Sequence, residues 1–260
     1  MTAALQPALN SLADQVAVVT GSSGGIGRAI ALELAARGAH VVVHGFRRGD
    51  EAEGVARQIR AMARECTVLL SDLSDPAARE AFVDAAWTWR GGIDVWVNNA
   101  GADVLTGEAA HWSFEKKLSE LWRVDVAATL GLSRDVGSRM QARGSGVIVN
   151  MGWDQAEQGM AGDSGEMFAA VKGAVMAFSR SLAQSLAPQV RVNALAPGWI
   201  RTAWAEGASE YWQSRAVKQS LRERWGTPED VARACAFLAS SEADFITGQV
   251  FPINGGFRYE

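Results

Sequence analysis

The chain has 260 residues, of which 48% are hydrophobic and 21% charged, and its formal net charge is −4 at pH 7. This composition is typical of a globular protein and gives no reason to expect a nucleic acid or an anionic membrane surface as a partner. No stretch approaches the roughly 20 apolar residues of a membrane span, and no signal-like segment opens the chain, so a cytoplasmic location is expected. Cys66 and Cys235 match no metal-binding spacing, and no metal site is expected.

Taken in chain order, apolar runs alternate with amphipathic segments. We expect strands at 16–20, 40–44, 67–70, 93–97, 147–150, 190–195 and 249–253. Helices are expected at 28–37, 51–63, between 75 and about 90, and at 113–142, 167–186, 204–224 and 228–239.

This alternation predicts an α/β fold, with right-handed crossovers and helices on both faces of a parallel sheet. We expect a single doubly wound Rossmann-type domain at 14–260, with a mostly seven-stranded sheet. Residues 1–13 are expected to form an N-terminal extension, and residues 203–225 a small helical lid.

A glycine-rich turn follows the first strand and opens the first helix. Gly21 permits a tight turn, Gly25 lets the backbone approach a pyrophosphate, and Gly27 allows the helix to pack closely on the strand. The free N–H groups and the helix dipole at this point attract phosphate. Strand, glycine turn and helix in this order predict a dinucleotide site.

Further motifs follow in a fixed order: Asp72 after the third strand, NNAG at 98–101, Lys172 on a helix, PGWIRT at 197–202 and TGQVFPINGG at 247–256. Together with TGSSGGIG at 20–27, they resemble the short-chain dehydrogenase/reductase family over residues 16–256. The resemblance implies an oxidoreductase that binds a nicotinamide dinucleotide and a small-molecule substrate.

The resemblance also implies which residues hold the cofactor. The pyrophosphate would lie against Gly21, Ser23, Gly25, Ile26 and Gly27, and the adenosine against Asp72, Asn99, Ala100 and Gly101. The nicotinamide ribose would be held by Lys172, and the nicotinamide would be flanked by Pro197, Gly198, Ile200 and Thr202.

The residues after the second strand favour one cofactor. An acidic residue there would accept hydrogen bonds from the adenosine 2′-hydroxyl and repel a 2′-phosphate. This chain has no acid until Asp50, and Arg47 and Arg48 precede it. Two guanidinium groups suit a phosphate dianion, so NADP(H) is expected rather than NAD(H).

The catalytic positions depart from the family pattern of Ser, Tyr, Lys and Asn. Of these four only Lys172 is kept: Phe168 stands at the tyrosine position, Trp153 at the serine position and Asp125 at the asparagine position. A phenyl ring cannot donate a proton, so carbonyl reduction by the family's usual mechanism is not expected.

The segment 153–166 is rich in acids, and two of them, Asp154 and Glu157, are candidate catalytic residues with Lys172 and Asp125. A buried carboxylic acid with a raised pKa can replace the proton donor. Acids can also stabilise a cationic substrate such as an iminium, whose reduction needs no oxygen-protonating tyrosine. Trp153, Phe168, Trp199 and Trp204 are the candidate walls of the substrate pocket.

Three functions stay open on this basis. The first is an NADP(H)-dependent reductase of C=N or conjugated C=C bonds in small, partly apolar substrates; it resembles the dienoyl-thioester reductases in lacking this tyrosine. The second is a catalytically inactive protein that binds the cofactor, and the third is a non-redox enzyme on the same fold.

Self-association is also expected. The helices at 113–142 and 167–186 resemble those that pair between subunits in the family. Leu118, Leu121, Met140 and Phe178 are expected on their outward faces, which predicts a homo-oligomer, in the form of a tetramer.

Overall fold

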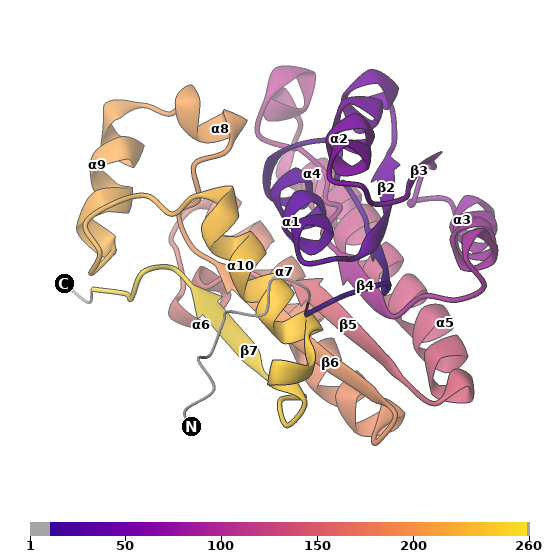
Figure 1. Cartoon of the computed structure of the whole chain (residues 1–260). Helices are drawn as coiled ribbons and strands as arrows, with labels where there is room; N and C mark the ends of the chain where they lie inside the picture. Colours follow the sequence, from indigo (N-terminus) through magenta and orange to yellow (C-terminus); the bar gives the residue numbers. More distant parts are fainter. Residues whose placement is uncertain (1–10, 259–260) are drawn as a thin grey trace.

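The fold is known from a computed structural model that describes residues 11–258, and it has a parallel sheet between two layers of helices (Figure 1). The seven strands lie in the order β3-β2-β1-β4-β5-β6-β7, and every neighbouring pair is parallel. The strands are β1 (Val16–Val19), β2 (His40–Gly45), β3 (Cys66–Leu70), β4 (Val95–Asn98), β5 (Gly146–Met151), β6 (Val190–Pro197) and β7 (Val250–Ile253). The predicted doubly wound Rossmann-type fold is confirmed.

The longer helices alternate with these strands as predicted. They are α1 (Gly25–Ala36), α2 (Gly49–Ala61), α3 (Pro76–Trp89), α4 (Phe114–Leu121), α5 (Ala128–Arg143), α7 (Asp163–Leu186), α9 (Glu210–Gln219) and α10 (Pro228–Ala239). Shorter elements are η1 (Gly107–His111), α6 (Gln155–Gln158), α8 (Ala203–Glu206) and η3 (Ser241–Ala243).

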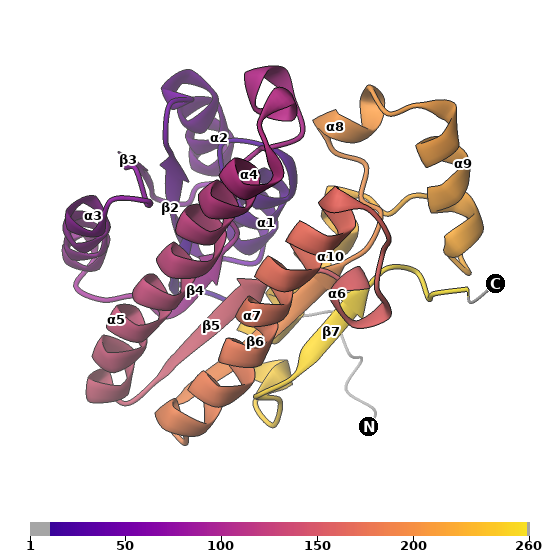
Figure 2. The ribbon, with the colours of Figure 1, turned by 180° about the vertical axis from the view of Figure 1, so that it is seen from behind.

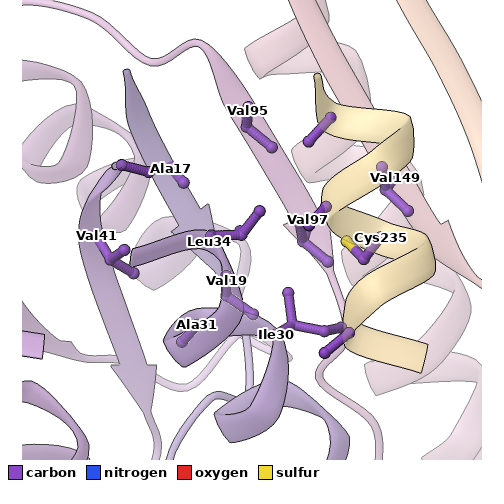
Figure 3. Packing of buried hydrophobic residues seen from close by; sticks show 14 of the residues in the cluster. Ala17, Val19, Ile30, Ala31, Leu34, Val41, Val95, Val97, Val149 and Cys235 are labelled. Atoms are coloured by element: carbon purple, nitrogen blue, oxygen red, sulfur yellow. The ribbon is translucent and has the colours of Figure 1, made fainter. Parts of the chain in front are cut away.

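One face of the sheet packs against α1, α2 and α10. Ile30 and Leu34 of α1 and Cys235 of α10 meet the strand side chains of Val19 and Val97, all of them buried (Figure 3). Because helices cover both faces, the central strands are continuous apolar runs without a polar side. Burial on both faces holds the sheet rigid, and the site is built at the ends of its strands.

The opposite face is covered by α3, α5 and α7 (Figure 2). Trp96 of β4 is fully buried there, and its Nε1 donates to Asn98 Oδ1 at 2.7 Å. Asn98 Nδ2 in turn donates to Asn150 Oδ1 and Ser133 Oγ, both at 2.8 Å. A buried and satisfied polar network of this kind fixes the register of β4, β5 and α5 beneath the site.

The long helix expected at 113–142 is interrupted. Between α4 and α5 the chain makes a π-helical segment, η2 (Trp122–Ala127), which contains Asp125. Such insertions are frequently found at functional sites. Leu121 and Met140 are fully buried within the chain, so the prediction that they form an outward apolar stripe was wrong; Leu118 and Phe178 are half-buried.

Two peripheral segments were also predicted. Residues 1–10 of the expected N-terminal extension lie outside the described part of the chain, whereas Leu12 is buried and its N–H donates to Arg37 O at 3.0 Å. The segment predicted to be a lid forms the helices α8 and α9, which project beyond the sheet (Figure 1). Within residues 11–258, no helix combines the length and apolarity needed to cross a bilayer.

Candidate active site

A cavity of about 530 Å³ opens at the carboxyl ends of the central strands. It lies near the neighbouring strands β1 and β4, after which the chain continues to β2 on one side of the sheet and to β5 on the other. This topological switch point is where open α/β sheets bind their ligands. The lining residues are Ile26, Asn99, Leu105, Met151, Gly152, Trp153, Met160, Ser164, Phe168, Lys172, Pro197, Gly198, Trp199, Ile200, Thr202, Trp204, Trp212 and Trp225.

The glycine turn has the conformation that its sequence predicts. Gly21 has φ +64°, and a Cβ on it would lie 2.8 Å from Ala100 Cα. A Cβ on Gly27 would lie 2.4 Å from Gly21 O, so helix α1 can pack this closely only without a side chain. The N-terminus of α1 has no side-chain cap, and no atom comes within 4 Å of a Cβ on Gly24. Free N–H groups beside open space fit a pyrophosphate.

His44, on the neighbouring strand β2, is hydrogen-bonded to the glycine turn. It was not identified as a site residue from the sequence. Gly21 N–H donates to His44 Nδ1 at 2.9 Å, so the neutral ring carries its proton on Nε2, which donates to Ser71 O at 3.1 Å. Burial lowers the pKa of His44 to about 4. A neutral imidazole thus connects the glycine turn to the end of β3.

Charged groups gather at the expected adenosine end of the site. Asp72 Oδ1 accepts hydrogen bonds from Ser74 N at 3.0 Å and Ser74 Oγ at 2.6 Å. These bonds, with the charges of Arg123 and Arg47, lower the pKa of Asp72. Arg47 lies with its guanidinium 4.7 Å from the ring centre of Phe46, and Arg47 and Arg48 are both exposed.

Asn99 and Ala100 tie the end of β4 to the glycine turn. Asn99 Nδ2 donates to Thr20 O at 3.0 Å and to Gly21 O at 3.2 Å. Thr20 Oγ1 accepts from the N–H groups of both Asn99 and Ala100. The amide of Asn99 is therefore used to fix the turn, and the residue also lines the cavity.

Lys172 and Asp125 form an ion pair at the inner wall. Lys172 Nζ lies 2.7 Å from Asp125 Oδ2, and Asp125 is 2% exposed. Asp125 Oδ1 accepts from Ala102 N at 2.8 Å. A Cβ on Gly101 would lie 2.9 Å from Asp125 Oδ2, so this glycine makes room for the carboxylate.

The face of α7 that lines the cavity carries Ser164, Phe168 and Lys172, which are spaced by four residues. The Phe168 ring lies edge-on to Trp153 at 6.1 Å between centroids. Ser164 was not identified from the sequence, although the same spacing of four from Phe168 places its hydroxyl on this face. Tyr211, the one tyrosine within residues 11–258, is 62% exposed on α9 and does not line the cavity.

The two acids expected at the nicotinamide edge lie elsewhere. Asp154 is buried behind the cavity wall, where its Oδ2 accepts from Asn254 Nδ2 at 3.1 Å, and burial raises its pKa to about 6. Glu157 is on the outer surface and pairs with Arg180 at 2.9 Å. Neither side chain lines the cavity, because α6 turns both away from it.

The outer wall is an aromatic cluster. Trp199 and Trp204 stack with 6.3 Å between ring centroids, and Trp212 and Trp225 lie 5.4 Å and 6.0 Å from Trp199. Trp212 and Trp225 were not identified from the sequence. They come from helix α9 and the loop after it, and only the packing of these segments brings them to the cavity.

Comparison with known proteins agrees with this architecture. Residues 21–258 match the family model described as enoyl-(acyl carrier protein) reductase. The chain belongs to the short-chain dehydrogenase/reductase family. It is 35% identical over 251 residues to the 3-oxoacyl-acyl-carrier-protein reductase FabG of Aquifex aeolicus, covering 94% of this chain and 98% of the relative.

Two solved structures of the family are similar over nearly their whole length. A 7α-hydroxysteroid dehydrogenase complexed with NADH and 7-oxoglycochenodeoxycholic acid has a TM-score of 0.88 at 27% identity, covering 98% of this chain and 99% of that one. A gluconate 5-dehydrogenase of Burkholderia cenocepacia in complex with NADP and tartrate has a TM-score of 0.85 at 28% identity, covering 96% and 98%. The chain is an oxidoreductase of this family. Its described residues hold no cluster of three or more His, Cys, Asp or Glu side chains suited to a metal ion.

Proposed function

We propose that this protein is an NADP(H)-dependent reductase that transfers hydride to a C=N or conjugated C=C bond of a small, partly apolar substrate. The observation that carries the proposal is the Phe168 ring on the cavity wall, one helical turn before Lys172. The family's proton-donating tyrosine would occupy this position. A C=N⁺ bond accepts hydride without any proton, so its reduction does not need a phenol there.

The residues of the glycine turn fit a nicotinamide dinucleotide, which supplies the hydride when it is bound. Gly21, Ser23, Gly25, Ile26 and Gly27 would hold the pyrophosphate. Asp72, Asn99, Ala100 and Gly101 would line the adenosine. Lys172, Pro197, Gly198, Ile200 and Thr202 would surround the nicotinamide and its ribose.

The choice of NADP(H) rests on Arg47 and Arg48, which are exposed at the start of α2. The effect of Arg47 on the pKa of Asp72 supports its position at the adenosine end of the cleft. The two structural relatives described above are complexed with NADH in one case and NADP in the other. The pair of arginines supports NADP(H) rather than NAD(H).

The chain's own residues would bind the ribose and supply a proton where the substrate requires one. Lys172, neutralised by Asp125, would hold the ribose hydroxyls through its ammonium group. For a C=C substrate, which must gain a proton after hydride addition, the Ser164 hydroxyl is on the wall and can relay one from water. We assign no proton transfer to Asp154 or Glu157, because neither lines the cavity.

An open cavity of about 530 Å³ also favours catalysis over the inactive cofactor-binding alternative. In that alternative Trp153 and Phe168 would fill the old site, whereas here they contact each other along its wall. We further propose that α8 and α9 close over the bound substrate as a lid. The homotetramer and the cytoplasmic location stay predictions.

The test is NADPH oxidation against matched panels of simple ketones, cyclic imines and conjugated enones. Turnover of imines or enones with ketones near background would support the proposal. Ketone turnover at ordinary rates, on the order of 1–10³ s⁻¹, would contradict it. Inactivity on all three panels despite tight NADPH binding would favour the non-catalytic alternative.

A further inference from the structure

The composition of the cavity wall points to a substrate class. Six of the eighteen lining residues are aromatic, and they come from separate segments of the chain. These aromatic residues are Trp153, Phe168, Trp199, Trp204, Trp212 and Trp225. Such a wall offers flat faces to a flat ligand and few directional hydrogen bonds.

The four outer tryptophans form a connected wall rather than isolated contacts. Trp199 is its centre: Trp204 stacks on it with an interplanar angle of 20°, while Trp225 meets it edge-on at 68°. Trp199 Nε1 is fixed by a hydrogen bond to Gln219 Oε1 at 2.9 Å. The rings are therefore held in place before a ligand arrives.

The charge balance of the cavity disfavours an anionic substrate. Among the described residues that line it, Lys172 is the one ionisable side chain, and Asp125 already pairs with its Nζ at 2.7 Å. None of the other described lining residues is cationic, and Arg215 lies against Trp199 and Trp212 without lining the cavity itself. The polar side chains are few, and Asn99 has already committed its Nδ2 to Thr20 and Gly21.

Two features bear on a positively charged ligand. The guanidinium of Arg215 lies 5.3 Å from the ring centre of Trp212 and 6.0 Å from that of Trp199, so these two rings already hold a cation of the chain, and the other aromatic rings of the wall would receive that of a ligand. The Asp154 carboxylate stands directly behind the wall, with Oδ2 2.9 Å from where a Cβ on Gly198 would lie. Aromatic faces backed by a carboxylate attract a desolvated cation.

From these observations we propose that the cavity selects a flat, ring-containing cation whose charge is delocalised over a C=N⁺ bond, that is, a cyclic iminium. This inference rests on the proposed hydride transfer and narrows its substrate. The hydride of NADPH would form the new C–H bond at the iminium carbon, and the C=N π pair would become the lone pair on nitrogen. The products are a neutral amine and NADP⁺, and no proton is consumed, which agrees with a phenyl ring at Phe168.

Binding of three bicyclic aromatic probes tests the substrate class without turnover. The probes are N-methylisoquinolinium (cation), 2-methylnaphthalene (neutral) and 2-naphthoate (anion), titrated calorimetrically into the protein saturated with 1,4,5,6-tetrahydro-NADP, whose nicotinamide ring is neutral as in NADPH but transfers no hydride. We expect the cation to bind at least tenfold more tightly than the neutral isostere and the anion to bind most weakly. Equal or tighter binding of either other probe would overturn the proposal.

Two variants test whether the preference for the cationic probe arises in the cavity. Trp204→Leu should reduce the preference for the cation severalfold, whereas Trp122→Leu, at a half-exposed tryptophan on η2 outside the cavity, should leave it unchanged. An unchanged preference in a folded Trp204→Leu protein would contradict the assignment, and the comparison of probes on the wild-type chain stands whether or not that variant folds.

Failure of the proposed hydride transfer can be distinguished from failure of the proposed ligand class. If the cation preference holds but NADPH is not oxidised by 2-methyl-3,4-dihydroisoquinolinium, the hydride transfer is wrong and the ligand class stands. If neutral enones are reduced but cations do not bind, the hydride transfer stands and the cyclic iminium is wrong.

Discussion

Lys172 Nζ lies 2.7 Å from Asp125 Oδ2, and of this ion pair Lys172 lines the cavity while Asp125 is buried behind it. Asp125 lies on the π-helical segment η2. Its other carboxylate oxygen, Oδ1, accepts a hydrogen bond from the N–H of Ala102. The lysine that would hold the ribose is therefore positioned by a buried carboxylate. The sequence resemblance to the family predicts an asparagine at this position instead.

Asp125→Asn should destabilise the fold because it leaves the Lys172 ammonium without a counter-charge. Breaking a buried pair in this way typically costs about 3 kcal/mol in the free energy of unfolding. The matched control is Glu120→Gln, which breaks the exposed pair with Arg123 one turn earlier and should change the free energy by about 0.5 kcal/mol or less. Urea denaturation measures both, and equal losses would contradict the buried pair.

The double variant Asp125→Asn/Lys172→Met should recover part of this loss, since it removes both charges together. Lys172→Met alone should weaken NADPH binding, because anchoring of the ribose does not depend on a tyrosine. A Lys172→Met protein that binds NADPH as tightly as wild type would show that the lysine does not contact the cofactor.

Arg47→Ala should weaken NADPH binding selectively. Loss of a charge-assisted hydrogen bond to the 2′-phosphate costs roughly 1.5–3 kcal/mol, while NADH, which lacks that phosphate, should bind as before. Arg57→Ala, at an exposed arginine of α2, is the control and should affect neither cofactor. Tryptophan fluorescence titration gives the dissociation constants; tighter binding of NADH than NADPH by the wild-type protein would reject NADP(H) preference.

His44 should make stability depend on pH. Its pKa falls from an ordinary 6.5 to about 4 on folding, so between these values the unfolded chain binds more protons. The stabilisation is complete above pH 6.5 and is lost as the pH falls to about 4, a change of about 3 kcal/mol. Asp154, whose pKa is raised to about 6, acts with the opposite sign in part of this range.

The contribution of His44 is therefore isolated by comparison with a variant. In His44→Asn the amide oxygen can still accept from Gly21 N–H but does not titrate. The difference in unfolding free energy between wild type and variant should shrink as the pH falls from 6.5 to 4. A constant difference across this range would mean that His44 does not titrate as its burial implies.

The parts of the site that follow from local sequence were predictable. Gly21 and Gly27 are recognisable because strand, turn and helix are contiguous, and Phe168 and Lys172 because one helix fixes their spacing. Trp212 and Trp225 were not predictable, since they reach the cavity only through the packing of α9 on Trp199. Asp154 and Glu157 were misplaced because the orientation of the four-residue helix α6 depends on tertiary contacts with Asn254 and Arg180.

The most direct test of hydride transfer without a phenol is the effect of Phe168→Tyr on two substrates. For a cyclic iminium, kcat/KM with NADPH should change by no more than about twofold, because no oxygen is protonated in that reaction. For a simple ketone, wild-type turnover should be near background and the tyrosine should raise it, since a positioned general acid contributes ~10²–10⁴-fold. Wild-type ketone reduction on the order of 1–10³ s⁻¹, or a large gain in iminium reduction with the tyrosine, would contradict the account.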